Sequence, residues 1–205
     1  MPKKPVTRAR KSATQERSKA TVDAILAATA RVLVKEGYDH ASTNKIAEAA
    51  GVSIGSLYQY FPSKEALVAA VGERHVDGML EILRTSAVRA ASMPLEEAAR
   101  ALVGVMIEAH RVDPKLHKVL VEQIPRVGNM EHVNRIDDEA VALVRSYLEN
   151  RKDEVGVTNL DMAALLAVGA VEAMTHIAVL RRPELLSDPT FVEEVANLIV
   201  RYLRG

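Results

Sequence analysis

The sequence predicts an all-α protein in which a small N-terminal helical domain is joined to a larger helical domain. Apolar residues recur at three- and four-residue spacing through most of the 205 residues, and no alternating run of strand length interrupts them. Residues that start and stop helices divide the chain into about nine helices. Hydrophobic residues make up 48% of the chain, which is enough to bury a substantial core.

The first helix is predicted upstream of residue 37. Apolar residues at helical spacing define its buried face, and Gly37 ends it. Ser42 or Thr43 is suited to cap a short second helix, and Ser53 to cap a short third one. Ser63 is suited to cap a long fourth helix that runs to about residue 88.

Prolines and glycines bound the next helices. Pro94 suits the first turn of the fifth helix. Asp113 and Pro114 read as the cap and first residue of a sixth helix, which stops by Pro125. A seventh amphipathic helix covers residues 133–148 and is ended by the glycine at 156.

The last two helices have clear start signals. Thr158 and Asp161 resemble a capping box for a helix that runs to about Arg182. Asp188 followed by Pro189 starts the final helix.

Composition and charge limit the function. The chain has no cysteine, so disulfides and thiolate metal sites are excluded. The longest apolar stretch starts at Ala163 but carries Glu172 and His176, which favours a buried helix over a membrane span. The charged N-terminus is not a secretory signal. We therefore expect a cytoplasmic protein without a membrane partner.

The net charge of zero hides an asymmetry. Residues 1–64 hold eleven Lys or Arg and five Asp or Glu, a net charge of +6, so the remainder carries −6. Residues 1–17 form a basic arm that we expect to be flexible. A basic first third on an acidic body indicates a polyanionic partner at one end. A solvated basic tail is the alternative.

The second and third predicted helices fit a helix-turn-helix that starts at Thr43. Ala47 falls where the two helices cross closely, and Gly51 falls where the turn requires a positive φ. Four further residues occupy the positions of the shared core: Ile46, Ala50, Val52 and Leu57. An ordinary helical hairpin is the alternative.

The third helix is predicted to have an inward and an outward face. Leu57 and Phe61 face inward at i and i+4, so the hydroxyls and the amide of the intervening residues lie on other faces. Tyrosine hydroxyls donate to phosphates, and Gln59 has the two-pronged amide that pairs with adenine. The helix therefore suits a DNA groove.

The segment GYDHASTNKIAEAAGVSIGSLYQYFPSKEAL resembles the DNA-binding segment of the tetracycline-repressor (TetR/AcrR) family of bacterial regulators, most closely from about Ser18 to Gly78. The resemblance implies a helix-turn-helix DNA-binding domain at 18–78 and a ligand-binding and dimerisation domain at 79–205. It implies a homodimeric transcriptional repressor that a small molecule releases from double-stranded operator DNA, and not an enzyme. An activator, or a regulator without a ligand, is the alternative.

The resemblance also implies which residues contact DNA. Tyr60 and Lys64 match backbone anchors, and Arg17 with its basic neighbours matches an arm that enters a minor groove. Ile54 departs from the family's pattern because many relatives have a basic residue there, and Gln59 departs because His is frequent there. The predicted DNA-contacting residues are Arg17, Ser42, Thr43, Ser53, Gly55, Ser56, Tyr58, Gln59, Tyr60 and Lys64.

The last two helices supply a plausible dimer interface, because small residues let helices approach closely and apolar residues add surface. The predicted interface residues are Ala163, Ala167, Ala170, Val195, Leu198 and Ile199. The alternative is that these helices form only the core of one protomer.

The middle helices are few in aromatics and rich in Met, Ala, Val and Leu, which favours a mainly apolar effector. The predicted pocket residues are Met106, His110, Tyr147, Glu172 and His176. Glu172 and His176 lie one helical turn apart, so a metal site, or a metal-dependent enzyme using them, is the remote alternative. With no third ligand at matching spacing, we expect neither a metal nor another cofactor.

Overall fold

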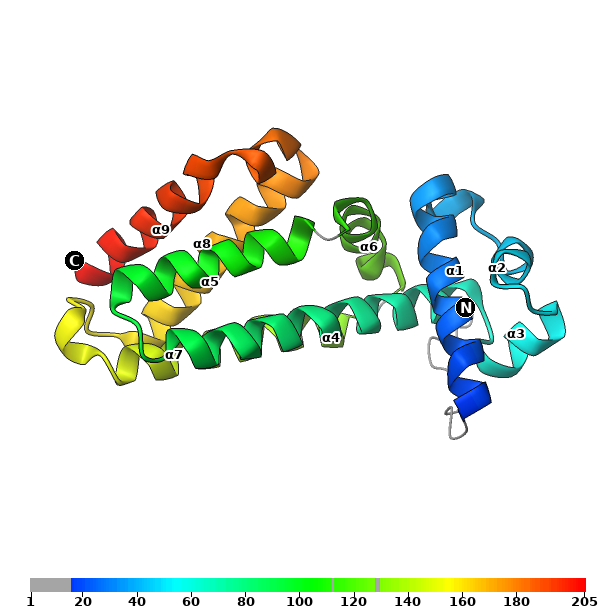
Figure 1. The fold of residues 1–205 in the computed structure, drawn as a ribbon, viewed down its shortest axis with the longest axis horizontal. Coiled ribbons are helices and arrows are strands. Elements are labelled where there is room, and N and C mark those ends of the chain that lie inside the picture. Colours follow the sequence, from blue (N-terminus) through cyan, green and yellow to red (C-terminus); the bar gives the residue numbers. More distant parts are fainter. Residues whose placement is uncertain (1–15, 112, 128–129) are drawn as a thin grey trace, which may run out of the picture. The chain divides into compact units, whose positions relative to one another are not determined.

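The structure is a computed structural model that describes the backbone of residues 16–111, 113–127 and 130–205, and the side chains of 18–111, 113–123 and 135–205. Within this part of the chain the fold is all-helical, as predicted (Figure 1). The α-helices are α1 (Glu16–His40), α2 (Thr43–Ala50), α3 (Ile54–Tyr60), α4 (Lys64–Ala90), α5 (Leu95–Arg111), α6 (Pro114–Val127), α7 (Met130–Glu149), α8 (Leu160–Leu180) and α9 (Pro189–Arg204). Two short 3-10 helices are η1 (Lys152–Glu154) and η2 (Pro183–Ser187).

The chain divides into two compact units. Unit 1 comprises Met1–Val76 and Lys115–His132, and unit 2 comprises Asp77–Pro114 and Val133–Gly205. Residues 115–132 were predicted to lie in the second domain, whereas in the structure they cluster with unit 1. One contact of this segment inside unit 1 joins α6 to α4, because Nε2 of His75 on α4 lies 3.0 Å from Nδ1 of His117 on α6.

The helix boundaries of unit 1 follow the predicted signals. Gly37 breaks α1 with φ 73° and ψ 170°, although the helical assignment resumes beyond it. Ser42 Oγ accepts a hydrogen bond from the Lys45 N–H at 3.3 Å, and Ser53 Oγ accepts one from the Ser56 N–H at 3.1 Å. The predicted caps of the second and third helices are thus confirmed, and Ser42 rather than Thr43 is the cap.

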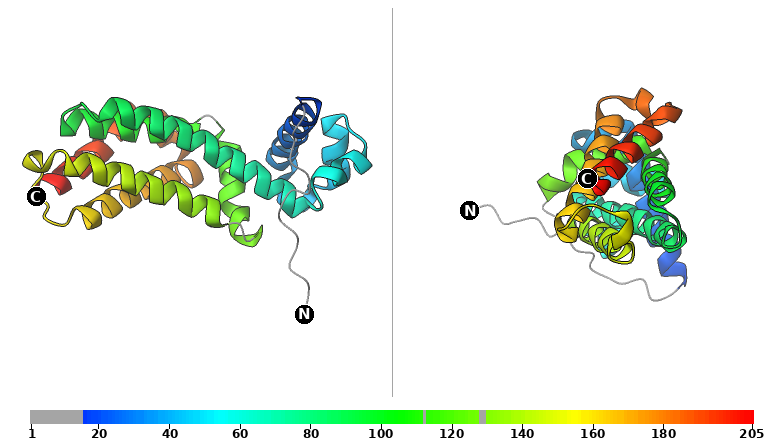
Figure 2. Two further views of the ribbon diagram at one scale, coloured as in Figure 1. Left: turned by 90° about the horizontal axis from the view of Figure 1, so that it is seen from below. Right: turned by 90° about the vertical axis from the view of Figure 1, so that its left-hand side faces the viewer.

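Unit 2 is a helical bundle in which α5 packs against α8 and α9, as Figure 2 shows from two further sides. One group of buried residues includes Leu95, Leu148 and Ala163, and a second includes Val103 and Ala178. Burial of such side chains is the main source of stability for helices of this length.

Helix α8 is long and apolar enough to cross a membrane by length and composition alone, with a mean hydropathy of 1.9. It is also a core helix of unit 2, because six of its residues are buried there. Four of its large apolar residues, Met162, Leu165, Leu166 and Ile177, remain exposed, so the helix is only partly covered within one protomer.

Two predicted helix boundaries were wrong. The cap of α8 is Asn159, whose Oδ1 accepts from the Met162 N–H at 3.0 Å. The Thr158–Asp161 capping box does not form because Asp161 pairs with Arg145 at 2.8 Å instead. Helix α6 continues past residue 125 to Val127, since a proline in the last turn of a helix removes only one hydrogen bond from it.

Candidate DNA-binding and effector sites

The turn between α2 and α3 is closed by backbone hydrogen bonds. Gly51 adopts φ 67° and ψ 30°, the left-handed conformation predicted for it. Its N–H donates to the Glu48 carbonyl at 3.0 Å, and the Val52 N–H donates to the Ala47 carbonyl at 3.0 Å. This is a Schellman ending, and it fixes the direction in which the chain enters α3.

Of the four residues predicted for the shared core, Ile46 and Leu57 are buried beneath the turn, and Ala50 and Val52 are half-buried. Ile46 and Leu57 are 0% exposed, and Ala47 and Phe61 are nearly as buried. The burial of Ala47, which is 3% exposed, agrees with its predicted place where the two helices cross. The second and third helices therefore share one core, which distinguishes a helix-turn-helix from two loosely joined helices.

The outer face of α3 carries polar and aromatic groups. Tyr58 is 42% exposed, and its hydroxyl lies 3.0 Å from Oγ1 of Thr43 on α2. Gln59 and Gly55 are exposed, while Ser56 is half-buried and its Oγ lies 2.8 Å from that of Ser53. The structure thus brings one side of the two helices together as a single polar surface.

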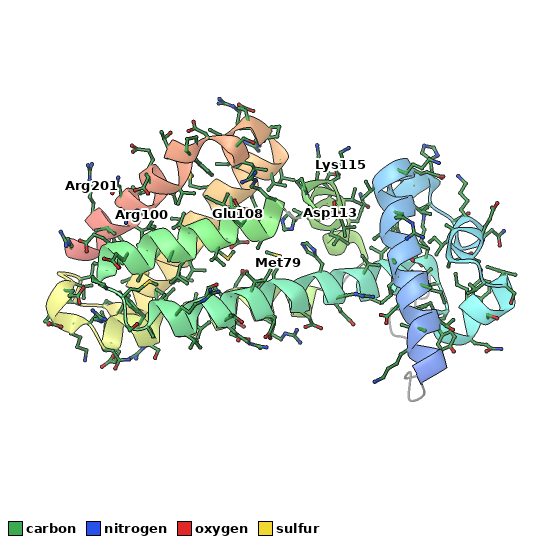
Figure 3. All side chains as sticks on the ribbon, in the orientation of Figure 1. Met79, Arg100, Glu108, Asp113, Lys115 and Arg201 are labelled. Carbon is green, nitrogen blue, oxygen red and sulfur yellow. The ribbon has the colours of Figure 1, made fainter. Side chains whose placement is uncertain are left out.

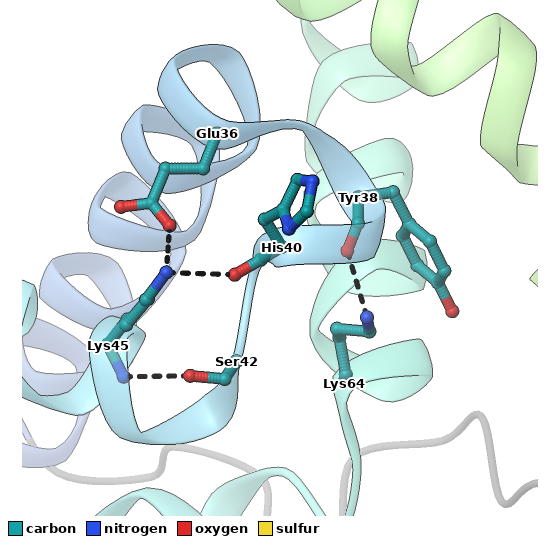
Figure 4. Close-up of polar contacts among 6 residues, drawn as sticks. All are labelled: Glu36, Tyr38, His40, Ser42, Lys45 and Lys64. Atoms are coloured by element: carbon teal, nitrogen blue, oxygen red, sulfur yellow. Dashed lines mark hydrogen bonds and ion pairs between the residues drawn. The ribbon is translucent and has the colours of Figure 1, made fainter.

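The two predicted backbone anchors also hold unit 1 together. The Tyr60 hydroxyl lies 2.9 Å from Oγ of Ser18 on α1. The Lys64 ammonium donates to the Tyr38 carbonyl at 2.8 Å, and it lies 4.1 Å from the centroid of the Tyr38 ring (Figure 4). An ammonium has three N–H donors, so this contact leaves room for a phosphate. Arg17 lies in α1, but its side chain is outside the described residues.

Two further contacts position α2, and the sequence reasoning missed them. Lys45 forms an ion pair with Glu36 at 2.5 Å and donates to the His40 carbonyl at 3.1 Å (Figure 4). The hydrogen bond from Lys45 lowers the pKa of the Glu36 carboxyl. Arg31 donates to the Ala49 carbonyl at 3.1 Å, near the C-terminal end of α2. These partners come from α1, at distances along the chain that no local motif indicates.

In unit 2 the predicted pocket residues are only partly together. Nδ1 of His110 lies 2.7 Å from the Met106 carbonyl, and the rings of His110 and His176 meet edge to face with centroids 5.7 Å apart. Nδ1 of His176 lies 3.8 Å from a carboxylate oxygen of Glu172. Met106, His110, Glu172 and His176 thus gather on α5 and α8.

Tyr147 lies apart from this group. Its hydroxyl donates to the Met93 carbonyl at 2.8 Å, and its ring packs against the buried group that contains Leu148. The first residue of α8, Leu160, packs against the same buried group as Tyr147. His176 lies sixteen residues further along α8, which is about 24 Å at 1.5 Å per residue. Tyr147 is therefore better described as a structural residue than as part of that pocket.

Asp137 on α7 joins the polar group, and the sequence reasoning missed it. Burial raises its pKa to about 6, and repulsion from Glu172 adds to this. Burial also raises the pKa of Glu172 and lowers that of His176, while Asp137 opposes the change at His176. We call His110, Asp137, Glu172 and His176 the polar cluster of unit 2.

An open groove of about 520 Å³ lies between α4 and α5 of unit 2, and its lining is mostly apolar. Arg100 and Glu108, labelled on α5 in Figure 3, lie at this groove, and Arg100 is paired with Glu193 of α9 at 2.7 Å. None of the predicted pocket residues lines it. The groove residues are Ile82, Ser86, Arg89, Met93, Arg100, Ala101, Gly104, Val105, Glu108 and Ala109.

Four of the six predicted dimer-interface residues are core residues of unit 2. Ala163, Ala167, Val195 and Ile199 are at most 7% exposed, because they face the packing of α5, α8 and α9 rather than the surface. Ala170 is half-buried, and Leu198 is 53% exposed.

A helix-turn-helix with a polar outer face, on an N-terminal segment of net charge +6, defines a DNA-binding regulator. Comparison with known proteins gives the family. Residues 25–71 match the family described as bacterial regulatory proteins, tetR family, and residues 94–203 match the tetracyclin repressor-like C-terminal domain. The chain belongs to the TetR family and is a DNA-binding transcriptional regulator.

Relatives of known function include a transcriptional repressor and a transcriptional activator. The chain is 28% identical over 154 residues to the HTH-type transcriptional repressor KstR of Mycolicibacterium smegmatis, covering 72% of each chain. It is 46% identical over 66 residues to the HTH-type transcriptional activator FasR of the same species, covering 30% of each. The fold matches that of the fatty acid degradation regulator FadR from Bacillus halodurans, with a TM-score of 0.70, 22% identity, and coverage of 90% and 97% of the two chains.

Proposed function

We propose that the protein is a cytoplasmic homodimeric repressor that leaves its operator when a small effector binds in unit 2. The observation that carries DNA recognition is the exposure of Tyr58 and Gln59 on α3, above the core formed by Ile46 and Leu57. A glutamine amide hydrogen-bonds base edges, and tyrosine hydroxyls donate to phosphates. Lys64, at the start of α4, is suited to anchor the adjacent backbone.

An exposed apolar surface on α8 and α9 supports the dimer. One short recognition helix contacts too few base pairs to specify a site, and a twofold dimer doubles the number of base pairs contacted. We call this the α8–α9 surface: Met162, Leu165, Leu166, Ile177, Leu198 and Tyr202, each 36–54% exposed. On α8 these residues and the exposed small residues Gly169 and Ala173 follow helical spacing, so they form one stripe. This surface replaces the buried residues that the sequence reasoning assigned to the interface.

Contiguous apolar surface of this kind is costly in water and marks an interaction site. A second copy of the chain suits the α8–α9 surface, because in a twofold interface the surface of each protomer would cover the same surface of its partner. The proposed interface also accounts for the high hydropathy of α8, since its outward face would be covered in the dimer.

The groove between α4 and α5 is the site proposed for an apolar effector. Its volume of about 520 Å³ falls in the range of small-molecule pockets, roughly 300–1,000 Å³. An effector that favours a dimer geometry unsuited to the operator shifts the population away from DNA. A hundredfold loss of operator affinity requires about 2.7 kcal/mol of differential binding.

The test is a binding titration of purified protein against labelled DNA from the region upstream of its own gene, with sedimentation to measure assembly. The proposal expects saturable, salt-sensitive binding by a dimer at two half-sites about 34–36 Å apart. A monomer that binds all DNA equally would overturn it. In a reporter assay, deletion of the gene raises expression from the bound promoter under the repressor assignment. A fall in expression would instead favour an activator, as FasR is.

A further inference from the structure

The polar cluster of unit 2 contains a histidine whose tautomer is fixed. His110 is 2% exposed, and its Nδ1 lies 2.7 Å from the Met106 carbonyl oxygen. A carbonyl accepts only, so Nδ1 carries the hydrogen and Nε2 carries the lone pair. An imidazole that donates one N–H to a backbone carbonyl and offers the other nitrogen is the usual arrangement of a metal-binding histidine.

The second imidazole lies close to the first. A ring nitrogen of His110 and one of His176 are within 4.8 Å of each other. Two nitrogens bound to one ion at roughly 2.0–2.1 Å stand about 3.4 Å apart, so a small movement is needed. The His176 side chain is 28% exposed, which leaves it room to rotate.

Two carboxylates act on the His176 ring. Glu172 Oε1 lies 3.8 Å from Nδ1 of His176, where it is suited to orient that ring so that Nε2 faces a ligand. Asp137, from α7, is near enough to Glu172 and His176 to act on both electrostatically. Among the residues whose side chains are described, the charges that act on Asp137 are Glu172, His176 and Asp138. The cluster is thus an acidic, partly buried site whose charge a cation would balance.

We propose that unit 2 binds one divalent transition-metal ion of the Zn²⁺ class, with His110 and His176 as nitrogen donors, Asp137 as an oxygen donor and Glu172 orienting His176. Imidazole together with carboxylate is a donor set that Zn²⁺ accepts, and imidazole selects against Mg²⁺ and Ca²⁺. No third ligand stands at helical spacing from Glu172 and His176 in the sequence. The fold brings His110 from α5 and Asp137 from α7.

Metal binding here goes beyond the proposed effector response, and it does not depend on that response because it is measured on the free protein. The groove between α4 and α5 does not include any residue of the polar cluster. An apolar effector and a metal ion would therefore have separate sites in unit 2.

The experiment titrates the full chain, freed of metal with EDTA and dialysed, with Co²⁺ followed by visible absorption and with Zn²⁺ followed by calorimetry. We expect one ion per chain, with Co²⁺ ligand-field bands that Zn²⁺ abolishes. His176→Gln and Asp137→Asn should each weaken binding at least about tenfold, and Glu172→Gln by about 10–100-fold. His40→Gln is the matched control, because His40 is exposed in unit 1.

Circular dichroism checks that each variant is folded. His110→Gln alters a buried residue, so His176→Gln and Asp137→Asn, which alter half-buried residues, decide the matter. The absence of saturable binding would overturn the proposal, as would binding unchanged in both variants. Binding lost in His75→Gln but kept in His176→Gln would also overturn it, since the ion would then belong to the histidine pair of unit 1.

Discussion

Unit 1 and unit 2 assemble their candidate functional residues in different ways. In unit 1, nine of the ten residues predicted to contact DNA lie between Ser42 and Lys64, and caps and a glycine turn a few residues away position them. In unit 2, the polar cluster draws on three helices, and His110 and His176 are 66 positions apart. A site whose residues lie close together in the sequence can be predicted from it. A site whose residues are brought together by helix packing can be identified only from the structure.

The largest expected effect tests whether the two units act through a dimer. Replacing Leu166 and Leu198 with Glu places charges on the α8–α9 surface, so the dimer should dissociate and operator affinity should fall at least about a hundredfold, or 2.7 kcal/mol. Sedimentation and anisotropy with operator DNA measure the two effects. Val88→Glu is the control, because Val88 is an exposed apolar residue of α4, 77% exposed, outside this surface. A double variant that stays dimeric would contradict the assignment.

The next largest effect tests whether Lys64 of unit 1 contacts a DNA phosphate as well as the Tyr38 carbonyl. Lys64→Ala should reduce operator affinity by roughly tenfold and lower the slope of log K against log salt by about 1 per half-site, because it removes a phosphate charge. Lys118→Ala, at an exposed lysine of α6, should leave that slope unchanged. Anisotropy at several salt concentrations gives the slopes. Equal slopes for wild type and Lys64→Ala would show that Lys64 serves only Tyr38.

Two glycines of unit 1 provide a matched pair. Gly51→Ala should cost about 1 kcal/mol of stability, because its φ of 67° is unfavourable for a residue with Cβ. Gly55→Ala should not lower thermal stability and should raise it by at most about 1 kcal/mol, since alanine favours a helix and an added Cβ would meet nothing nearer than Ser53 Oγ at 3.9 Å. We expect Gly55→Ala to weaken DNA binding instead, because Gly55 lies exposed at the start of α3. Operator affinity equal to wild type in Gly55→Ala would show that Gly55 does not lie at the DNA interface.

The smallest expected effect concerns pH and unit 2. The pKa of Asp137 is raised from 3.8 to about 6, so the folded state binds more protons between these values and stability declines as pH rises from 4 to 6. Asp137→Asn should therefore stabilise metal-free protein at pH 7.5, by at most about 1 kcal/mol because Asp137 is partly exposed, and by little at pH 4. Urea denaturation in EDTA at the two pH values measures this. An equal gain in stability at pH 4 and pH 7.5 would show that it does not arise from the raised pKa of Asp137.

The sequence was sufficient for the all-helical fold and for the helix-turn-helix. Gly51, Ala47 and the caps Ser42 and Ser53 satisfy requirements that act over a few residues, so their spacing carries the information. The roles of Arg31 and Lys45 could not be predicted, because each contact joins α1 to α2 and depends on how the two helices pack.

Unit 2 was less predictable for a physical reason. Ala163 and Val195 belong to apolar faces that serve equally well as a core or as an interface, and only the packing of α5 against α8 and α9 decides between these uses. Tyr147 was assigned to the pocket, but its hydroxyl donates to the Met93 carbonyl, a contact 54 positions away along the chain that no local pattern indicates. Asp137 gave no local signal, because its neighbours in the cluster come from α5 and α8.

The most direct test of the central claim, that α3 of unit 1 reads operator bases, is a panel of operators that each carry one exchanged base pair. With wild-type protein, exchanges at the contacted positions should each cost about 1–3 kcal/mol. With Gln59→Ala, the cost at one position per half-site should vanish while the others remain. A Gln59→Ala protein that discriminates every position as the wild type does would contradict the account.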